Sequence, residues 1–343
     1  GFMFIAIGAG ALQNNATADN NVAMGYQALK LNTTGTLNVA VGSYALDTNT
    51  TGSSCTAIGA SALDANTTAS SNTALGSESL TGNTTGTLNV GVGARALRSN
   101  TTANHNTAIG YKTLDVNTTG ASNVALGSEA LAANTTADNN TAVGKSALLA
   151  NTTGAQNVAL GSQALDANTT ASNNTSIGYQ SLTTNTTGAS NTAVGQSALS
   201  TNSTGSSNTA IGRQALIANT TASENTAVGY QALYANTTGD GNTAIGVKAM
   251  DANTVGDRNV AVGADALGSM NPASNADTYN TAVGYYAGAA VTTGHNNTLM
   301  GGLAGNSLTT ATHSTFIGRA AGEGVTTGTQ NTAVGYHALY LCE

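Results

Sequence analysis

Residues 225–241 read NTAVGYQALYANTTGDG, and residues 242–258 read NTAIGVKAMDANTVGDR, so one 17-residue phrase is repeated almost unchanged. The glycine that ends "AVG" or "AIG" marks the period. It recurs every 17 residues from Gly8 to Gly263 and, after one step of 21, from Gly284 to Gly335. These glycines define 20 repeats, which predict a single repeat array over residues 1–343. The four extra residues form an insertion loop within 268–279, around the only proline, Pro272.

The composition supports an ordered repeat protein. Of 343 residues only 7% are charged, 42 are glycine and one is proline. Disordered chains usually carry many charges or prolines, so disorder is not expected. The net charge of −7 contains no cluster of Lys or Arg that would indicate nucleic-acid binding. No stretch of about 20 apolar residues predicts a membrane span.

The repeat unit is numbered here from the Asn of "NTAVG". Position 3 is nearly always Ala, position 4 is always aliphatic, position 9 is Leu or Met in 17 copies, and positions 6 and 7 vary freely. This pattern predicts a core of one aliphatic side chain at position 4 and one at position 9, with positions 6 and 7 outside. Frequent Gly, Asn and Thr disfavour a helix.

A 17-residue unit cannot bury a core alone, but stacked copies can. We therefore predict an all-β, parallel β-solenoid of about 20 coils with a 17-residue repeat. Positions 2–4 are expected to form a strand, and positions 8–10 a second short strand. "NTTG" is expected to form a corner whose glycine supplies unusual backbone angles. At ~4.8 Å per coil, the stack would be a rod on the order of 95 Å long.

Three repeats suggest that position 12 points at least partly inward. Where position 9 is Gly instead of Leu, position 12 changes from Asn to a large apolar residue; the pairs are Gly288 with Val291, Gly305 with Leu308, and Gly322 with Val325. One apolar group leaves as another arrives, so the two positions are expected to share core space. The stacked Asn residues at position 12 could then form an amide ladder.

The same asparagines lie in Asn-x-Ser/Thr triplets, which are acceptors for N-glycosylation. Two interpretations therefore stay open, a column of glycans along one edge or a buried amide ladder. The candidate glycosylation sites at position 12 are Asn15, Asn32, Asn49, Asn66, Asn83, Asn100, Asn117, Asn134, Asn151, Asn168, Asn185, Asn202, Asn219 and Asn236.

Tyrosines recur at position 6 and are candidates for surface contacts with sugars or partner proteins. They are Tyr26, Tyr111, Tyr179, Tyr230, Tyr285 and Tyr336. Threonines are also frequent, and flat Thr arrays on a solenoid can order water, so an ice-binding solenoid is an alternative. The paired Thr at positions 13 and 14 are adjacent and lie at the corner, which is not the spacing that this function requires.

No residue pattern indicates catalysis. The four histidines have no Cys, Asp or Glu partner at metal-ligand spacing. The glycines do not lie between a strand and a helix, as a phosphate-binding loop would require. We therefore expect no enzyme activity, no cofactor and no metal. Cys55 and Cys342 are too far apart in an array to pair with each other. We expect both to be incidental thiols, and an intermolecular bridge at Cys342 is the alternative.

The motif "NTAVGYQAL…NTTG" resembles the head repeats of trimeric autotransporter adhesins and the similar repeats of phage tail-fibre-like proteins. The resemblance covers essentially the whole chain. It implies a parallel β-roll, three chains wound about one axis, and attachment to surfaces.

These observations predict a non-catalytic structural fibre or adhesin-like shaft, extracellular and located at a cell surface or in a virion fibre. The expected partners are further copies of the chain, as a homotrimer, and a glycan or protein of a host surface. An alternative is a subunit of an open head-to-tail filament, which could be glycosylated.

Overall fold

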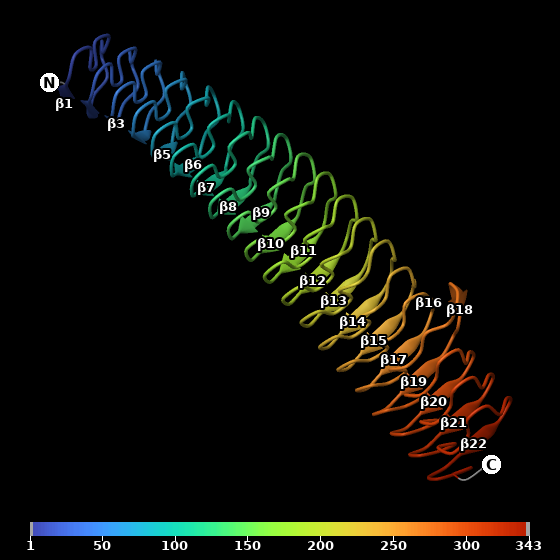
Figure 1. The fold of residues 1–343 in the computed structure, drawn as a ribbon. Helices are drawn as coiled ribbons and strands as arrows, with labels where there is room; N and C mark the ends of the chain where they lie inside the picture. Colours follow the sequence, from blue (N-terminus) through green and yellow to red (C-terminus); the bar gives the residue numbers. More distant parts are fainter. Residues whose placement is uncertain (1–2, 341–343) are drawn as a thin grey trace. The chain divides into compact units, whose positions relative to one another are not determined.

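The computed structural model describes residues 3–340, which are all-β and contain no helix. Contacts divide the chain into two compact units, unit 1 (Gly1–Ser172) and unit 2 (Asn173–Glu343). Each unit is a parallel β-solenoid in which every coil contributes one short strand (Figure 1). The expected β-solenoid with a 17-residue repeat is therefore confirmed.

Unit 1 contains ten strands, which pair in sequence order with a register of one repeat; Ala40, for example, lies opposite Ala23 and Ala57. The strands are β1 (Phe4–Ile7), β2 (Asn21–Met24), β3 (Val39–Val41), β4 (Thr56–Ile58), β5 (Thr73–Leu75), β6 (Val90–Val92), β7 (Thr107–Ile109), β8 (Val124–Leu126), β9 (Thr141–Val143) and β10 (Val158–Leu160).

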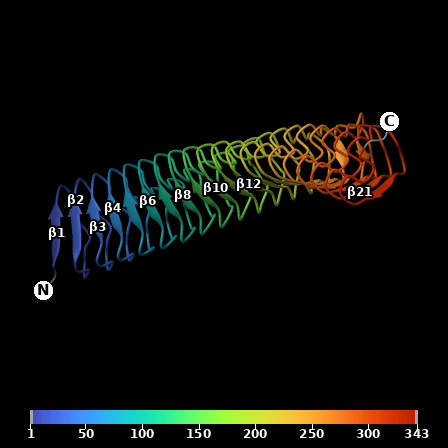
Figure 2. The same cartoon turned by 90° about the horizontal axis from the view of Figure 1, so that it is seen from below.

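Figure 2 shows strands β1 to β4 of unit 1 side by side. Unit 2 repeats the same arrangement, as where β12 pairs with β13. Its main sheet consists of β11 (Thr175–Ile177), β12 (Thr192–Val194), β13 (Thr209–Ile211), β14 (Thr226–Val228), β15 (Thr243–Ile245), β17 (Val260–Val262), β19 (Thr281–Val283), β20 (Thr298–Met300), β21 (Thr315–Ile317) and β22 (Thr332–Val334). The insertion adds a separate two-stranded pair, β16 (Gly256–Asp257) with β18 (Ala276–Asp277).

The strands confirm the expectation for positions 2–4 but correct the predicted core. Side chains alternate along a strand, and Ala at position 3 faces inward; Ala57 and Ala210, for instance, are fully buried. Positions 2 and 4 therefore face outward. The aliphatic residue at position 4, expected inside, is exposed: Leu75 and Leu126 each keep 44% of their surface. The coil is narrow at the strand, and most coils place Ala there.

The prediction of a second strand at positions 8–10 is wrong. Positions 6–11 form turns in which residues 7 and 9 adopt left-handed backbone angles, as at Tyr44 (φ 58°) and Leu46 (φ 54°). This conformation still bonds coil to coil, because Leu46 N donates to Ala62 O at 2.9 Å and Tyr44 N to Tyr26 O at 2.9 Å. Leu46 is fully buried, and its burial offsets the cost of the left-handed angle.

The corner at "NTTG" exists, but its glycine does not supply the unusual angle. Gly52, at position 15, has no left-handed φ, and several coils have Ala there, such as Ala69. The left-handed glycine is the one at position 5. Gly42 has φ 138°, and a Cβ on it would lie 2.4 Å from Gly59 O of the next coil. This close approach explains why glycine marks the period.

The exchange between positions 9 and 12 is confirmed, with an addition. Val291, at position 12, is buried, and a Cβ on Gly288 would approach Leu299, Leu267 and Val291. Position 3 also changes in this region, from Ala to Leu299 and Phe316, and both side chains are fully buried. The large side chains at position 3 fill the space that the missing leucines leave.

Candidate functional site

The outward side of the strands is the main surface feature of each unit. We call it the sheet face and define it as positions 2 and 4 of all coils. Position 4 is aliphatic in every coil. Leu126 is an example from unit 1, and Ile211, which is 40% exposed, is an example from unit 2. Because position 4 places one outward-facing aliphatic side chain, exposed or half-buried, on each consecutive strand, the sheet face forms a continuous apolar stripe within each unit. Contiguous apolar surface of this kind marks an interaction site.

The sheet face also lacks charge. No Lys, Arg, Asp or Glu occupies position 2 or 4 in any of the 20 repeats, although the chain has 25 such residues, 9 basic and 16 acidic. The charges lie at positions 6, 7, 10, 16 and 17, except Glu343, which is outside the described residues. A charge-free apolar surface beside well-charged ones is the pattern of a buried interface core.

Position 2 differs between the units. In unit 2 it is Thr in nine of ten strands, the exception being Val260. In unit 1 six of ten are apolar: Ile5, Val22, Val39, Val90, Val124 and Val158. The sheet face is therefore more apolar in unit 1 than in unit 2.

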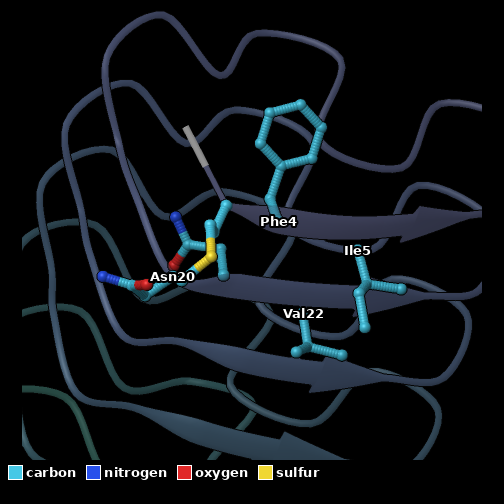
Figure 3. A pocket seen from close by; sticks show the side chains of 6 residues that line it. Phe4, Ile5, Asn20 and Val22 are labelled. Carbon is cyan, nitrogen blue, oxygen red and sulfur yellow. The ribbon is translucent and has the colours of Figure 1, made fainter. Parts of the chain in front are cut away.

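A pocket of about 490 Å³ opens at the first strands of the sheet, lined by Met3, Phe4, Ile5, Asn20, Asn21 and Val22. Figure 3 shows Ile5 and Val22 on the neighbouring strands β1 and β2. Phe4 takes the position that Asn holds in most other coils, and it is 51% exposed. We assign no ligand to this pocket.

The six predicted tyrosines are all exposed, from 39% at Tyr230 to 70% at Tyr336. They lie in different coils and do not form one patch. Local neighbours hold several of them: Tyr26 packs edge-on against Tyr44 with ring centroids 5.3 Å apart, and Arg213 lies over Tyr230 at 5.8 Å. Tyr111, Tyr179 and Tyr285 are likewise exposed. Position 7 also carries tyrosines, Tyr44 and Tyr286, which the sequence analysis did not single out.

The asparagines at position 12 form the amide ladder. Asn49 Nδ2 donates to Asn32 Oδ1 at 2.9 Å and to Gly52 O at 3.0 Å, so both amide hydrogens are used. All the candidate glycosylation sites except the half-buried Asn15 are fully buried. A sugar on Nδ2 would remove one of these bonds and would lie inside the coil. The folded coil therefore excludes glycans at the buried sites and satisfies the ladder interpretation.

A second ladder at position 1 closes the same corner. Asn38 Nδ2 donates to Gly52 O at 2.9 Å, the carbonyl that Asn49 also contacts. Asn38 Oδ1 accepts the backbone N–H of Cys55 in the next coil at 2.9 Å. Cys55 replaces Asn in this ladder and is buried, and burial raises the pKa of its thiol. Cys342 lies outside the described residues.

The charged groups cluster at positions 7 and 10. Asp115 is buried between Arg95 Nη2 at 3.1 Å and Arg98 Nε at 3.0 Å. Burial raises the pKa of Asp47, and burial together with the charge of Asp47 raises the pKa of Asp64. Burial also raises the pKa of Asp251 and of Asp257.

Over residues 3–340 no group of three or more His, Cys, Asp or Glu side chains is arranged to hold a metal ion. His295 and His313 are in ring contact, with centroids 5.5 Å apart. Within the same residues no helix is long and apolar enough to cross a membrane.

In comparisons with known proteins, no protein-family model matches the chain. No curated protein matches it in sequence either.

Proposed function

We propose that the chain is a non-catalytic structural subunit of an extracellular fibre, an adhesin-like shaft whose copies associate through the sheet face. The observation that carries the proposal is the charge-free aliphatic stripe at position 4, exposed in both units. A surface that repeats one aliphatic group per coil fits a partner with the same repeat. Another copy of this chain has the same repeat, because it has the same sequence.

The resemblance of the repeats to trimeric adhesin heads favours three copies. The unequal sheet face favours a parallel arrangement, because the apolar position 2 of unit 1 would then pack on itself and the threonines of unit 2 would pack on threonines. In such an assembly the residues at positions 6, 7 and 10, which include the tyrosines, would remain free for surface contacts. Location at a cell surface or in a virion fibre, and attachment to a host glycan or protein, are parts of the same proposal.

A charge placed on the sheet face tests the proposal. Leu126→Lys, at position 4, would bring one lysine per chain into the interface without a partner charge. We expect association to weaken by at least about tenfold, measured by sedimentation velocity over a concentration series. Tyr111→Lys, at the exposed position 6, is the matched control and should associate like the unchanged chain. Equal association of both variants would contradict the proposal.

A second candidate function, ice binding, is favoured by position 2 of unit 2. There nine threonines, beginning with Thr175, face outward from a regular sheet beside β-branched or similar side chains at position 4. Such rows of methyl and hydroxyl groups at the strand spacing of ~4.8 Å can order water. This function needs an uncovered sheet face. Thermal hysteresis from a single free chain would support it and would contradict the fibre proposal.

A further inference from the structure

A shallow groove of about 520 Å³ lies in unit 2, on the turns that follow strands β17, β19 and β20. Its lining residues are Ser269, Tyr286, Ala289, Ala290, Asn306 and Ser307. They occupy positions 7, 10 and 11 of three consecutive coils and therefore lie off the sheet face. The groove stays open whether or not the sheet face is covered.

The groove lies where position 10 lacks a large side chain in two consecutive coils. Gly268 and Ala289 fill position 10, where Asp251 stands in the preceding coil and Glu323 in a later one. Ala290 fills position 11. The floor is therefore made of backbone and methyl groups, and the larger side chains before and after it limit its length to a few coils.

One wall of the groove is an aromatic ring held in place. Tyr286 is half-buried and packs against Tyr285 with ring centroids 4.4 Å apart and an interplanar angle of 61°. The charge of the neighbouring Asp265, followed by that of Tyr285, raises the pKa of Tyr286, and both neighbours also hydrogen-bond with its hydroxyl. The ring thus offers an apolar edge and face to the groove.

The remaining polar groups of the groove are free. The side chains of Asn306, Ser269 and Ser307 make no hydrogen bond to any residue between 3 and 340. They present an amide and two hydroxyls at the ends of the groove. No Lys or Arg lines it, and Asp265 beside it is acidic, so an anionic ligand is disfavoured.

We propose that this groove binds a neutral saccharide. A pyranose ring has an apolar C–H face, which packs on an aromatic ring, and a rim of hydroxyls, which bond to amides, hydroxyls and carboxylates. Tyr286 supplies the first kind of contact, and Asn306, Ser269 and Ser307 supply the second. The volume lies within the range of small-molecule sites, and the shallow shape suits a weakly bound sugar unit. The carbohydrate chemistry comes from this geometry and does not depend on self-association.

The test uses the full chain and saturation-transfer NMR with glucose, galactose, mannose, N-acetylglucosamine and their common disaccharides. At least one sugar should receive saturation from the protein. Its affinity, from titration, should fall by about tenfold in Tyr286→Ala, which removes the ring, and in Ala290→Arg, which fills the floor. Asn306→Ala, which leaves the packing intact, should also weaken binding.

Leu88→Ala is the control, because Leu88 is an exposed side chain at position 17 in unit 1 and lies outside the groove. It should bind the sugar like the unchanged chain, and all variants should keep the melting temperature within a few degrees. Absence of saturation transfer to every sugar would overturn the proposal. Equal binding by Tyr286→Ala and Ala290→Arg would overturn it as well, since the sugar would then bind elsewhere.

Discussion

Asparagine closes each coil at the scale of single residues. The position 12 side chain uses both amide hydrogens, and its oxygen accepts the next side chain in the column; Asn117 Nδ2 donates to Asn100 Oδ1 at 3.0 Å and to Gly120 O at 2.9 Å. Asn134 Nδ2 then donates to Asn117 Oδ1 at 2.8 Å. A buried amide that lacks a partner lowers the stability of the fold. Loss of one Asn therefore also weakens its neighbours in the column.

Asn117→Ala should therefore destabilise its coil by about 1–3 kcal/mol, because Asn134 loses an acceptor inside the coil. Hydrogen exchange of the surrounding amides, such as Thr118, should accelerate, and the denaturation midpoint should fall. Thr119→Ala, at the exposed position 14, is the control and should change the stability little. An Asn117→Ala chain as stable as this control would show that the ladder does not stabilise the coil.

The raised pKa values of Asp47, Asp64, Asp251 and Asp257 predict an unusual pH dependence. Each group binds its proton more tightly in the folded chain than in the unfolded one. Its contribution to stability is fully present below the ordinary pKa of 3.8 and is lost as the pH rises through the raised folded value. Mild acidification from neutral pH should therefore raise the melting temperature.

The double variant Asp47→Asn with Asp64→Asn should show a smaller gain, because two of the four groups no longer titrate. Calorimetry at several values between about pH 7 and about pH 4 measures both chains. Burial would not be the cause of the shifts if acidification lowered the melting temperature of the unchanged chain. The same holds if acidification raised the melting temperature of both chains equally.

At the scale of the element, each coil consists of one strand and two tight turns. The glycine at position 5 lies between the strand and the first turn. Gly42→Ala would place a Cβ 2.4 Å from the backbone oxygen of Gly59 at a φ of 138°, which L-residues rarely adopt. We expect a loss of at least about 3 kcal/mol or local unfolding of that coil. Gly302→Ala is the control, since its Cβ would meet only Tyr285 O at 3.8 Å and Ala60 holds the same position elsewhere. The denaturation curves of the two variants test this role of position 5. Similar midpoints for Gly42→Ala and Gly302→Ala would contradict it.

The period, the strand at positions 2–4 and the inward Asn could be predicted because stacking forces every coil to repeat its neighbour. The outward orientation of the position 4 side chain could not be predicted, because its aliphatic character was taken as a sign of burial. Alternation along the strand with Ala at position 3 was the signal that could have corrected it. The turn at positions 8–10 was also missed, since a buried Leu such as Leu46 in a left-handed conformation is rare and follows from packing between coils.

The surface sites were predicted unevenly. The exposed tyrosines at position 6 follow from free variation beside fixed positions. The groove beside Tyr286 was not predicted, because it is formed by small residues of neighbouring coils, such as Ser269, Ala289 and Ser307. Such juxtaposition appears only once the coils are stacked in register.

At the scale of the whole molecule, the central claim is that an apolar, charge-free sheet face associates with copies of itself. The claim rests on the same stripe in unit 1 and unit 2, and on the absence of charge at positions 2 and 4 throughout the repeats. All of the chain's Lys, Arg, Asp and Glu residues lie at other positions, where they keep the remaining surface in water.

The most direct test is the mass of the native particle by light scattering, with refractive index and absorbance recorded together. We predict a discrete particle of three chains of 33.6 kDa each. A broad and very large mass would instead support the open head-to-tail filament. A mass of one chain at all concentrations would contradict self-association through the sheet face.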